Sequence, residues 1–285
     1  MNSAALETFL SANRDVIACE LTQVRGSSPR AEGTFMLVGM GAIFGTIGGG
    51  ALEYMVIDHA RRLIAEGRAE EAMDVPLGPE IGQCCGGRVL VGLRYADAPI
   101  RRELAERVAA LESAEPHVYV FGAGHVGRAL AHILSVLPVR VEVIDTRQEE
   151  LDLLPAGVAF RRVAMPEAVV RAAPAGSAFV ILTHDHALDF LIAFEALARR
   201  DSPYVGMVGS RTKRAKFASW FLEQGGKTEA LEQLVLPIGA QGLGDKRPSV
   251  IAVLAAAEIM VQIGGREATN GRTLTPFKRG VTSGH

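Results

Sequence analysis

The sequence predicts an α/β protein with an N-terminal α/β domain and a C-terminal Rossmann-like domain with a parallel sheet. At 285 residues, the chain is long for a single domain. In its second half, the apolar run 117–121 leads into a G-x-G-x-x-G turn at residues 122–127, and a helical pattern follows. A second apolar run, residues 139–144, ends at Asp145. Strand, glycine turn, helix, strand and acid in this order are typical of a nucleotide-binding βαβ unit.

The composition fits two soluble domains, and we place them at residues 1–114 and 115–285, on either side of a linker at residues 112–116. The net charge of −2 gives no general attraction for nucleic acid. We find no run of 18 apolar residues and no signal-peptide pattern at the start, so we expect no membrane segment. Three cysteines form no disulfide framework, which favours a cytoplasmic protein with reduced thiols.

Apolar periodicity predicts the remaining elements. In the first half we expect helices at residues 2–13 and 99–111, a helix that begins after residue 50, and strands at residues 15–24, 34–38, 42–47, 70–76 and 88–94. In the second half we expect the first helix at residues 128–136, further strands at 178–182, 204–208 and 234–238, a helix at 249–263, and a loose tail from residue 264.

Two glycine-containing segments of the first half are candidate ligand sites. Ser27, Ser28 and Arg30 follow a strand and suit a phosphate or another anion, although a polar hairpin turn explains them equally well. The triple glycine 48–50 opens a helix, whose free N–H groups suit a ligand that approaches the backbone. Glu53 in its first turn either complements the helix dipole or accepts hydrogen bonds from an N–H-rich ring.

A third segment holds two of the three cysteines. Gln83, Cys84 and Cys85 lie between glycines, where nothing bulky shields the sulfur atoms. A structural cysteine normally lies among aliphatic residues, as Cys19 does. Adjacent thiols in such a loop suit a metal, a sulfur donor or a cofactor, and the alternative is two small residues that fill a tight turn.

The predicted Rossmann turn contributes a further set of candidates. Its binding residues would be Gly122, Gly124, His125 and Gly127, with Asp145 at the position that contacts a ribose hydroxyl and Arg147 near enough to take a ribose phosphate. The same turn also occurs as pure architecture or holds another phosphate.

The ends of two later strands carry polar residues that should face the same crevice. His184, Asp185 and His186 are suited to bind a metal or to transfer protons, or Asp185 simply caps the next helix. Ser210 and Arg211 follow the next strand and begin a basic cluster.

Taken together and in this order, these motifs resemble those of the XdhC/CoxI family, the accessory proteins of xanthine dehydrogenase. The resemblance covers nearly the whole chain. The paired cysteines look like the xanthine dehydrogenase branch, whereas the carbon monoxide dehydrogenase branch often has a cysteine where this chain has Ala51.

The resemblance implies a chaperone, more a binding protein than a catalyst. Such a protein binds the molybdenum cofactor (molybdopterin) transiently, supports its sulfuration by a cysteine desulfurase, and inserts it into apo-xanthine dehydrogenase. It would be a homodimer, with Cys84 or Cys85 as a ligand of molybdenum or a carrier of sulfur. The alternative is an NAD(P)-dependent oxidoreductase that uses the Rossmann domain, although we do not expect NAD(P) to be required. A metal-dependent hydrolase built on His184, Asp185 and His186 is a third reading.

Overall fold

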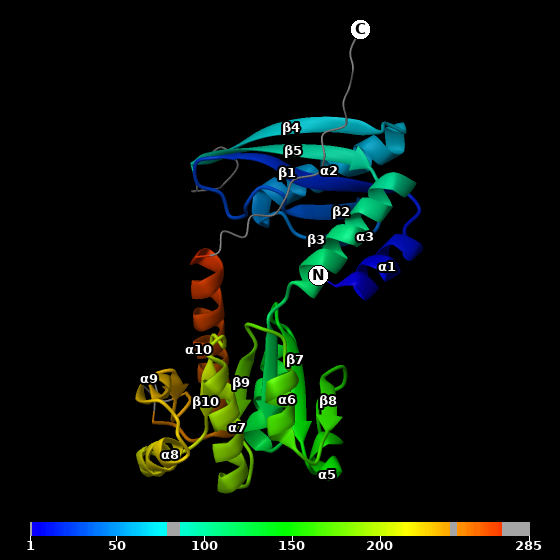
Figure 1. Ribbon diagram of the computed structural model, residues 1–285. Helices are drawn as coiled ribbons and strands as arrows, with labels where there is room; N and C mark the ends of the chain where they lie inside the picture. The colour runs from blue at the N-terminus through cyan, green and yellow to red at the C-terminus, as the bar shows by residue number, and fades with distance from the viewer. Residues whose placement is uncertain (1, 79–85, 240–243, 270–285) are drawn as a thin grey trace. The chain divides into compact units, whose positions relative to one another are not determined.

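The computed structural model describes residues 2–78, 86–239 and 244–269. The chain divides into two compact units, one that ends at Ala114 and one that begins at Glu115. Each unit has its own sheet and its own hydrophobic cores (Figure 1).

The first unit is built on an antiparallel sheet of five strands in the order β3-β2-β1-β5-β4. The strands are β1 (Val16–Arg25), β2 (Phe35–Gly39), β3 (Ile43–Gly45), β4 (Glu70–Leu77) and β5 (Gly87–Tyr95), and the helices are α1 (Ser3–Ala12), α2 (Gly50–Glu66) and α3 (Ala98–Ser113).

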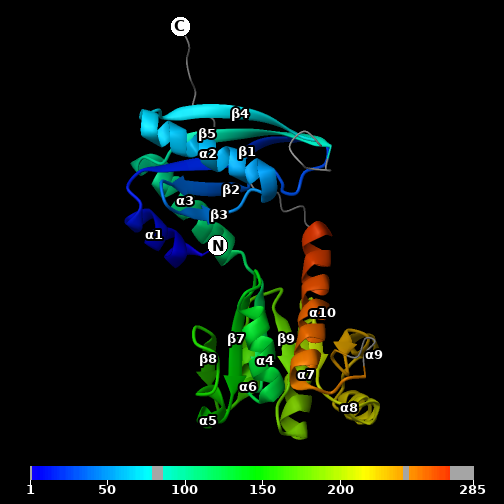
Figure 2. The same cartoon turned by 180° about the vertical axis from the view of Figure 1, so that it is seen from behind.

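Helices cover both faces of this sheet, with α2 on one face and α1 and α3 on the other (Figures 1 and 2). On the first face Leu52 and Val56 of α2 pack with Cys19 of β1. On the second face Leu6 of α1 and Leu104 of α3 pack in another cluster. At one end of the sheet, β1 leads into the segment at residues 26–30, and the neighbouring β5 begins directly after Gly86.

The second unit contains a parallel sheet of six strands in the order β11-β10-β9-β6-β7-β8. This is the Rossmann order, with the topological switch between β6 and β9. The strands are β6 (His117–Phe121), β7 (Arg140–Asp145), β8 (Ala159–Arg162), β9 (Ala178–Ile181), β10 (Val205–Met207) and β11 (Leu234–Val235). The helices are α4 (His125–Leu134), α5 (Gln148–Leu151), α6 (Pro166–Ala172), α7 (His186–Arg199), α8 (Arg211–Glu223), α9 (Thr228–Leu231) and α10 (Pro248–Thr269).

Alternate residues of β6 enter two different cores. Val118 and Val120 pack with α4 and α10, whereas Tyr119 and Phe121 pack with α6 and α7 on the opposite face. Figures 1 and 2 show these helix pairs on the two faces. Because strand side chains alternate between faces, the near-continuous apolar runs found in the sequence are the mark of strands buried on both sides. The predicted α/β class and the parallel Rossmann-like sheet are therefore confirmed.

Several boundaries differ from the predictions. Helix α4 begins at His125 rather than at residue 128, and α10 continues to Thr269, so the predicted loose tail does not begin at residue 264. Strand β8 and helix α6 were not predicted. All four residues of β8 are exposed, so the strand lacks the apolar alternation that reveals its neighbours.

Helix α10 contains, within the described residues, one stretch that has the length and composition of a membrane span, Pro248–Gly265 with a mean hydropathy of 1.6. The stretch is not a continuous apolar run, because Ser249, Glu258 and Gln262 interrupt it, and it was therefore not found in the sequence. In the fold, Ala255 and Ile259 are buried against α4. Glu258, in the middle of the stretch, accepts hydrogen bonds from the Tyr204 hydroxyl and the Gly239 N–H. These contacts hold one face of α10 against the Rossmann unit, while Val253 and Val261 on the helix are exposed.

Candidate functional site

The three glycine-containing segments of the first unit come together at one corner of its sheet. A β-carbon placed on Gly87 would lie 2.0 Å from the carbonyl oxygen of Ser27, and one on Gly26 would lie 3.3 Å from the Cα of Gly87. A β-carbon on Gly48 would lie 2.6 Å from the Cγ of Pro29. The Ser27 backbone leaves room only for glycine at Gly87, and the Pro29 ring occupies the space that a side chain at Gly48 would need. We call this meeting of segments 26–30, 48–50 and 86–87 the glycine corner.

The triple glycine forms the start of α2 in a conformation that other residues rarely adopt. Gly48, Gly49 and Gly50 have φ angles of 134°, 76° and 64°. No side chain among the described residues caps the helix at Gly49, and no atom lies within 4 Å of the place where a Gly49 β-carbon would be. Among the described residues, no side chain therefore caps the first N–H groups of α2, and its positive dipole end would favour an anionic or carbonyl-bearing ligand.

Glu53 holds this turn in place. Its Oε1 accepts hydrogen bonds from the Thr46 hydroxyl at 2.6 Å and from the Ile47 N–H at 2.9 Å. The Thr46 hydroxyl oxygen in turn accepts a hydrogen bond from the Gly48 N–H at 3.2 Å. The sequence left two roles open for Glu53, and the structure shows it fixing the strand-to-helix connection through one oxygen while Oε2 has no partner among the described residues.

The serine segment has polar groups that its own fold scarcely uses. Ser27 and Arg30 are exposed, and Ser28 accepts only a long hydrogen bond, 3.4 Å, from the Arg30 N–H. The predicted contacts of Gln83, Cys84 and Cys85 lie outside the described residues. The residues that flank this segment are tied together, because the Gly86 N–H donates to the Leu77 carbonyl at 2.8 Å.

The third cysteine behaves as predicted. Cys19 is fully buried in the core beneath α2, and burial raises the pKa of its thiol far above the usual value. A neutral, shielded thiol is chemically inert. Its packing role is confirmed.

In the second unit, the glycine turn lies at the switch point between β6 and β9. A β-carbon on Gly122 would lie 2.4 Å from the Leu182 carbonyl oxygen, and one on Gly127 would lie 1.9 Å from the Gly122 carbonyl oxygen. These two glycines therefore serve the packing of β6, α4 and the β9 loop. Gly124 has no atom within 4 Å of a β-carbon position, and His125 is exposed in the first turn of α4.

Asp145, predicted to contact a ribose, is already engaged. Its Oδ2 accepts from the Ala123 N–H at 2.8 Å, and both carboxylate oxygens accept from the Arg147 side chain at 3.1 Å. Burial alone would raise the pKa of Asp145, but the hydrogen bonds from Arg147 and the Ala123 N–H outweigh it, and the pKa lies below its ordinary value.

Arg147 is committed within the same network, rather than free for a ribose phosphate. It also contacts Glu150 at 3.3 Å, and Glu150 pairs with Arg128 at 2.6 Å. Arg128 donates to the Ala123 carbonyl at 2.8 Å. The turn is therefore braced from both sides by groups of the protein itself.

At the end of β9, Asp185 caps α7. Its carboxylate accepts from the Ala187 N–H at 2.8 Å, which is the structural role that the sequence left open. His184 and His186 are exposed. In residues 2–78, 86–239 and 244–269, no group of three or more His, Cys, Asp or Glu side chains is arranged to hold a metal ion.

A buried ion pair near these residues was not predicted as a unit. Asp189 is fully buried and pairs with Lys213, while its other oxygen accepts from the Thr183 hydroxyl at 2.6 Å. Lys213 also donates to the Val208 carbonyl at 2.9 Å. Ser210 caps α8 by accepting from the Lys213 N–H at 3.2 Å, and Arg211 is exposed. The sequence signal that could have revealed this pair is Asp189, an acid on the buried face of α7.

The structure thus brings the described candidates of the first unit, in segments 27–30 and 48–53, together at the glycine corner, while several candidates of the second unit brace or cap its loops. The fold and these turns define a protein with an α/β unit and a Rossmann unit.

Residues 9–75 match the XdhC and CoxI family, and residues 118–259 match the XdhC Rossmann domain. The chain belongs to the XdhC/CoxI family.

Two further comparisons agree with this assignment. The uncharacterized protein YqeB of Escherichia coli (strain K12) is 27% identical over 251 residues, which are 85% of this chain and 42% of YqeB. The chain therefore spans less than half the length of that relative. A crystal structure described as a xanthine dehydrogenase from Bacillus halodurans matches with a TM-score of 0.78 at 17% identity, over 95% of this chain and 98% of the other. This second match shows that the fold is shared.

Proposed function

We propose that the protein is an accessory factor of xanthine dehydrogenase that binds the molybdenum cofactor, supports its sulfuration and delivers it to the apoenzyme. Membership of the XdhC/CoxI family supports the accessory role. The observation that carries the binding role is the glycine corner, where three segments far apart in the sequence meet, with Ser27 exposed and no described side chain capping the start of α2.

The chemistry of the corner suits the chemistry of the cofactor. Molybdopterin has a terminal phosphate, a polar pterin ring and a dithiolene that holds molybdenum. The open N–H groups of α2 and the exposed Ser27 are donors for its anionic and carbonyl groups. Cys84 and Cys85, two and one residues before Gly86 in the sequence, would supply soft sulfur ligands next to these donors.

The proposed role implies partners. A cysteine desulfurase would supply the sulfur, and apo-xanthine dehydrogenase would receive the finished cofactor. We place this exchange in the cytoplasm and propose that a homodimer carries it out. Within the chain, Glu53 would keep the α2 start in its open conformation during both exchanges.

A second candidate, an NAD(P)-dependent oxidoreductase, is favoured by the Rossmann strand order and by the open position at Gly124. The engagement of both Asp145 oxygens weighs against it, because the usual ribose acceptor is occupied by Ala123 and Arg147.

The test is to purify the chain anaerobically from a molybdenum-replete host and to assay molybdenum, oxidised pterin and bound nicotinamide. The proposal predicts molybdenum and pterin in a fixed ratio, and activation of apo-xanthine dehydrogenase when a cysteine desulfurase and a sulfur source are added. A chain that carries nicotinamide and no pterin, and that reduces a carbonyl substrate, would establish the oxidoreductase instead.

A further inference from the structure

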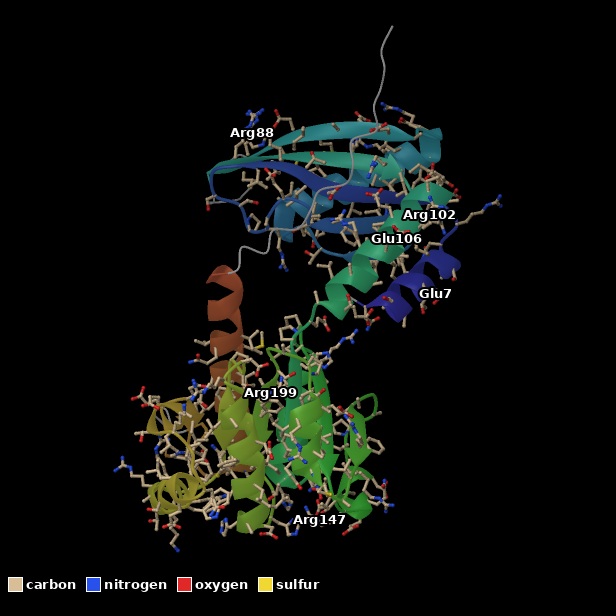
Figure 3. The ribbon with its side chains drawn as sticks, viewed as in Figure 1. Glu7, Arg88, Arg102, Glu106, Arg147 and Arg199 are labelled. Carbon is tan, nitrogen blue, oxygen red and sulfur yellow. The ribbon has the colours of Figure 1, made fainter. Side chains whose placement is uncertain are left out.

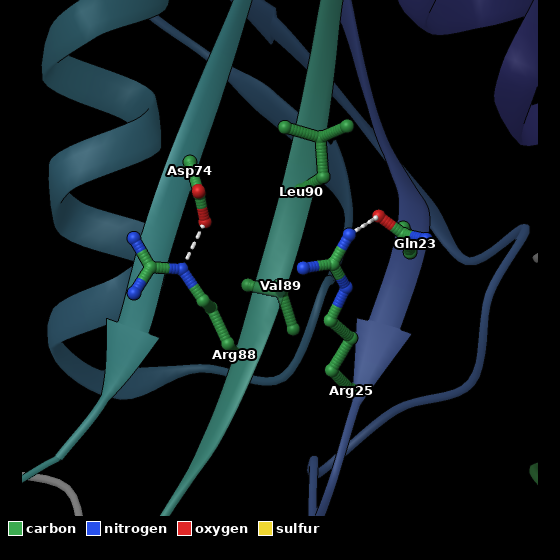
Figure 4. A pocket seen from close by; sticks show the side chains of 6 residues that line it. All are labelled: Gln23, Arg25, Asp74, Arg88, Val89 and Leu90. Carbon is green, nitrogen blue, oxygen red and sulfur yellow. Dashed lines mark hydrogen bonds and ion pairs between the residues drawn. The ribbon is translucent and has the colours of Figure 1, made fainter.

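Beside the glycine corner lies a cavity of about 190 Å³ on the sheet of the first unit. Figure 4 shows two arginines facing it from neighbouring strands, Arg25 at the end of β1 and Arg88 at the start of β5. The lining residues are Gln23, Arg25, Asp74, Arg88, Val89 and Leu90.

The two arginines lie directly opposite each other in the antiparallel register of β1 and β5. Like charges in directly opposite positions destabilise a sheet. Asp74 on β4 relieves this in part, because its Oδ1 accepts from the Arg88 Nε at 2.6 Å. Hydrogen bonding to Arg88 holds the pKa of Asp74 below its ordinary value.

Arg25 is less well compensated, because its charge also lowers the pKa of Asp74 but acts through space rather than through a hydrogen bond. It donates to the neutral side-chain oxygen of Gln23 at 2.9 Å, and within the described part of the chain it forms no ion pair. The cavity therefore combines two arginines with one carboxylate. The Asp74–Arg88 pair is about half exposed on both sides, so it is weak and leaves the Arg88 guanidinium able to turn toward a ligand.

The size of the cavity limits the ligand to a small group. Sites that enclose a whole small molecule have volumes of roughly 300–1,000 Å³, so a cavity of about 190 Å³ suits one end of a larger ligand. Two guanidinium groups match the oxygens of a phosphate, since each arginine presents a planar fork of donors.

The position links this cavity to the glycine corner. Arg25 immediately precedes Gly26, Arg88 immediately follows Gly87, and a β-carbon on Gly26 would lie 3.3 Å from the Gly87 Cα. Arg25 and Arg88 alternate with Val24 and Val89, which pack in the core with α2, so the cavity lies on the face of the sheet opposite α2. A ligand whose phosphate occupied the cavity would reach the corner at Gly26 and Gly87, the end of the sheet next to the two arginines.

We propose that Arg25 and Arg88 form the phosphate-binding part of the site and take the phosphomonoester end of the ligand. The identity of that ligand as the pterin cofactor rests on the proposed function, whereas the anion site itself does not. Bound phosphate would neutralise the two opposed arginines, so binding should stabilise the fold.

The first test measures binding of inorganic phosphate to the full chain by calorimetry and by the shift of its melting temperature, with sodium chloride at matched ionic strength as the control. We expect Arg25→Gln and Arg88→Gln each to weaken binding about tenfold, the loss of one charge-assisted contact. Asp74→Asn should strengthen it, because the competing carboxylate is gone. Arg102→Gln should leave it unchanged, since Arg102 lies exposed on α3 beside Glu106 (Figure 3).

Opposite effects of Arg25→Gln and Asp74→Asn identify a ligand site, because loss of fold would weaken binding in both. Equal phosphate affinity in the wild type, Arg25→Gln, Arg88→Gln and Arg102→Gln would overturn the proposal, as would no binding by the wild type at tens of millimolar phosphate.

The pterin content of the purified chain separates this proposal from the proposed function. If phosphate binding follows the arginines in a chain that never carries pterin, the anion site stands and the proposed function fails. If pterin occupancy is indifferent to both arginines, the function stands and the assignment of these arginines to the cofactor phosphate is wrong.

Discussion

The two units each contain a glycine-rich turn that leads from a strand into a helix, yet the turns differ in how their acidic residues are used. In the second unit Asp145 accepts from Ala123 and from the Arg147 fork, so charge and hydrogen bonds are satisfied internally. In the first unit Glu53 accepts only neutral donors, Thr46 and Ile47, through one oxygen. Both helix starts have open space at one glycine, Gly49 and Gly124. The two turns therefore differ in their acids, because Asp145 is held by an arginine whereas Glu53 accepts only from neutral donors among the described residues.

The surroundings reinforce the contrast. The turn of the second unit is flanked by the Arg147–Glu150–Arg128 network, whereas that of the first unit adjoins the serine segment and Gly87. A glycine turn thus signals close approach of a backbone, and whether a ligand or another part of the protein approaches depends on long-range contacts.

The largest expected effects come from glycines at which a β-carbon would meet backbone atoms. Gly127→Ala should lower the free energy of unfolding by roughly 3 kcal/mol, because the Gly122 carbonyl oxygen lies 1.9 Å from the new carbon. Gly124→Ala is the matched control, with open space and φ near −66°, and should cost less than about 1 kcal/mol. Urea denaturation of the full chain measures both. Equal losses would show that the turn is not packed as described.

The next effect concerns Cys84 and Cys85, which lie outside the described residues. We expect alanine at one of Cys84 and Cys85 to remove most of the bound molybdenum, with Cys85→Ala the more severe because Cys85 lies nearer to β5. Cys19→Ala is the control, since its buried thiol should change stability by about 1 kcal/mol and leave the molybdenum content unchanged. Full occupancy in both Cys84→Ala and Cys85→Ala would make the segment structural.

A smaller expected change in the free energy of unfolding tests the ion pair between Asp145 and Arg147. Asp145→Asn should cost about 1–2 kcal/mol at neutral pH, because it removes the charge that binds Arg147. The folded-state pKa of Asp145 lies below its ordinary value, so this contribution is present above the unfolded pKa of about 4 and is lost as the pH falls through the folded pKa. Unfolding curves of both proteins from pH 7 down to pH 3 should therefore converge on the acid side. A constant difference would show that the charge is not responsible.

The smallest effect is the binding of nicotinamide cofactors. Because Asp145 is engaged, NADH and NADPH should bind with dissociation constants near the millimolar range or weaker, about −4 kcal/mol. Fluorescence titration measures this directly. A micromolar constant together with turnover of a carbonyl substrate would reverse the comparison and make the second turn the working site.

The fold was largely predictable from the sequence because its central strands are apolar on both faces. The runs at β6 and β9 contain only buried residues after His117, and they were found from composition alone. Strand β8 was missed because its exposed residues give no burial signal. The start of α4 was placed late because His125 and Val126 belong both to the glycine motif and to the helix.

The site was predictable as a set of motifs but not as an arrangement. Gly26 meets Gly87 and Pro29 meets Gly48 across long stretches of sequence, and no local pattern indicates which glycine meets which backbone. Likewise, the acid at the end of β7 was found, but the return of Arg147 onto it depends on side-chain geometry. The opposition of Arg25 and Arg88 depends on strand register.

The measurement that tests the central claim most directly assigns the cofactor to one of the two turns. Ser27→Ala/Ser28→Ala removes hydroxyl donors at the glycine corner, and Gly124→Val fills the open position of the Rossmann turn. Both variants and the wild type are purified anaerobically, checked for folding by circular dichroism, and assayed for molybdenum and oxidised pterin. We predict that the serine variant loses cofactor while Gly124→Val keeps it. Loss in Gly124→Val with full occupancy in the serine variant would contradict the account and place the cofactor in the Rossmann unit.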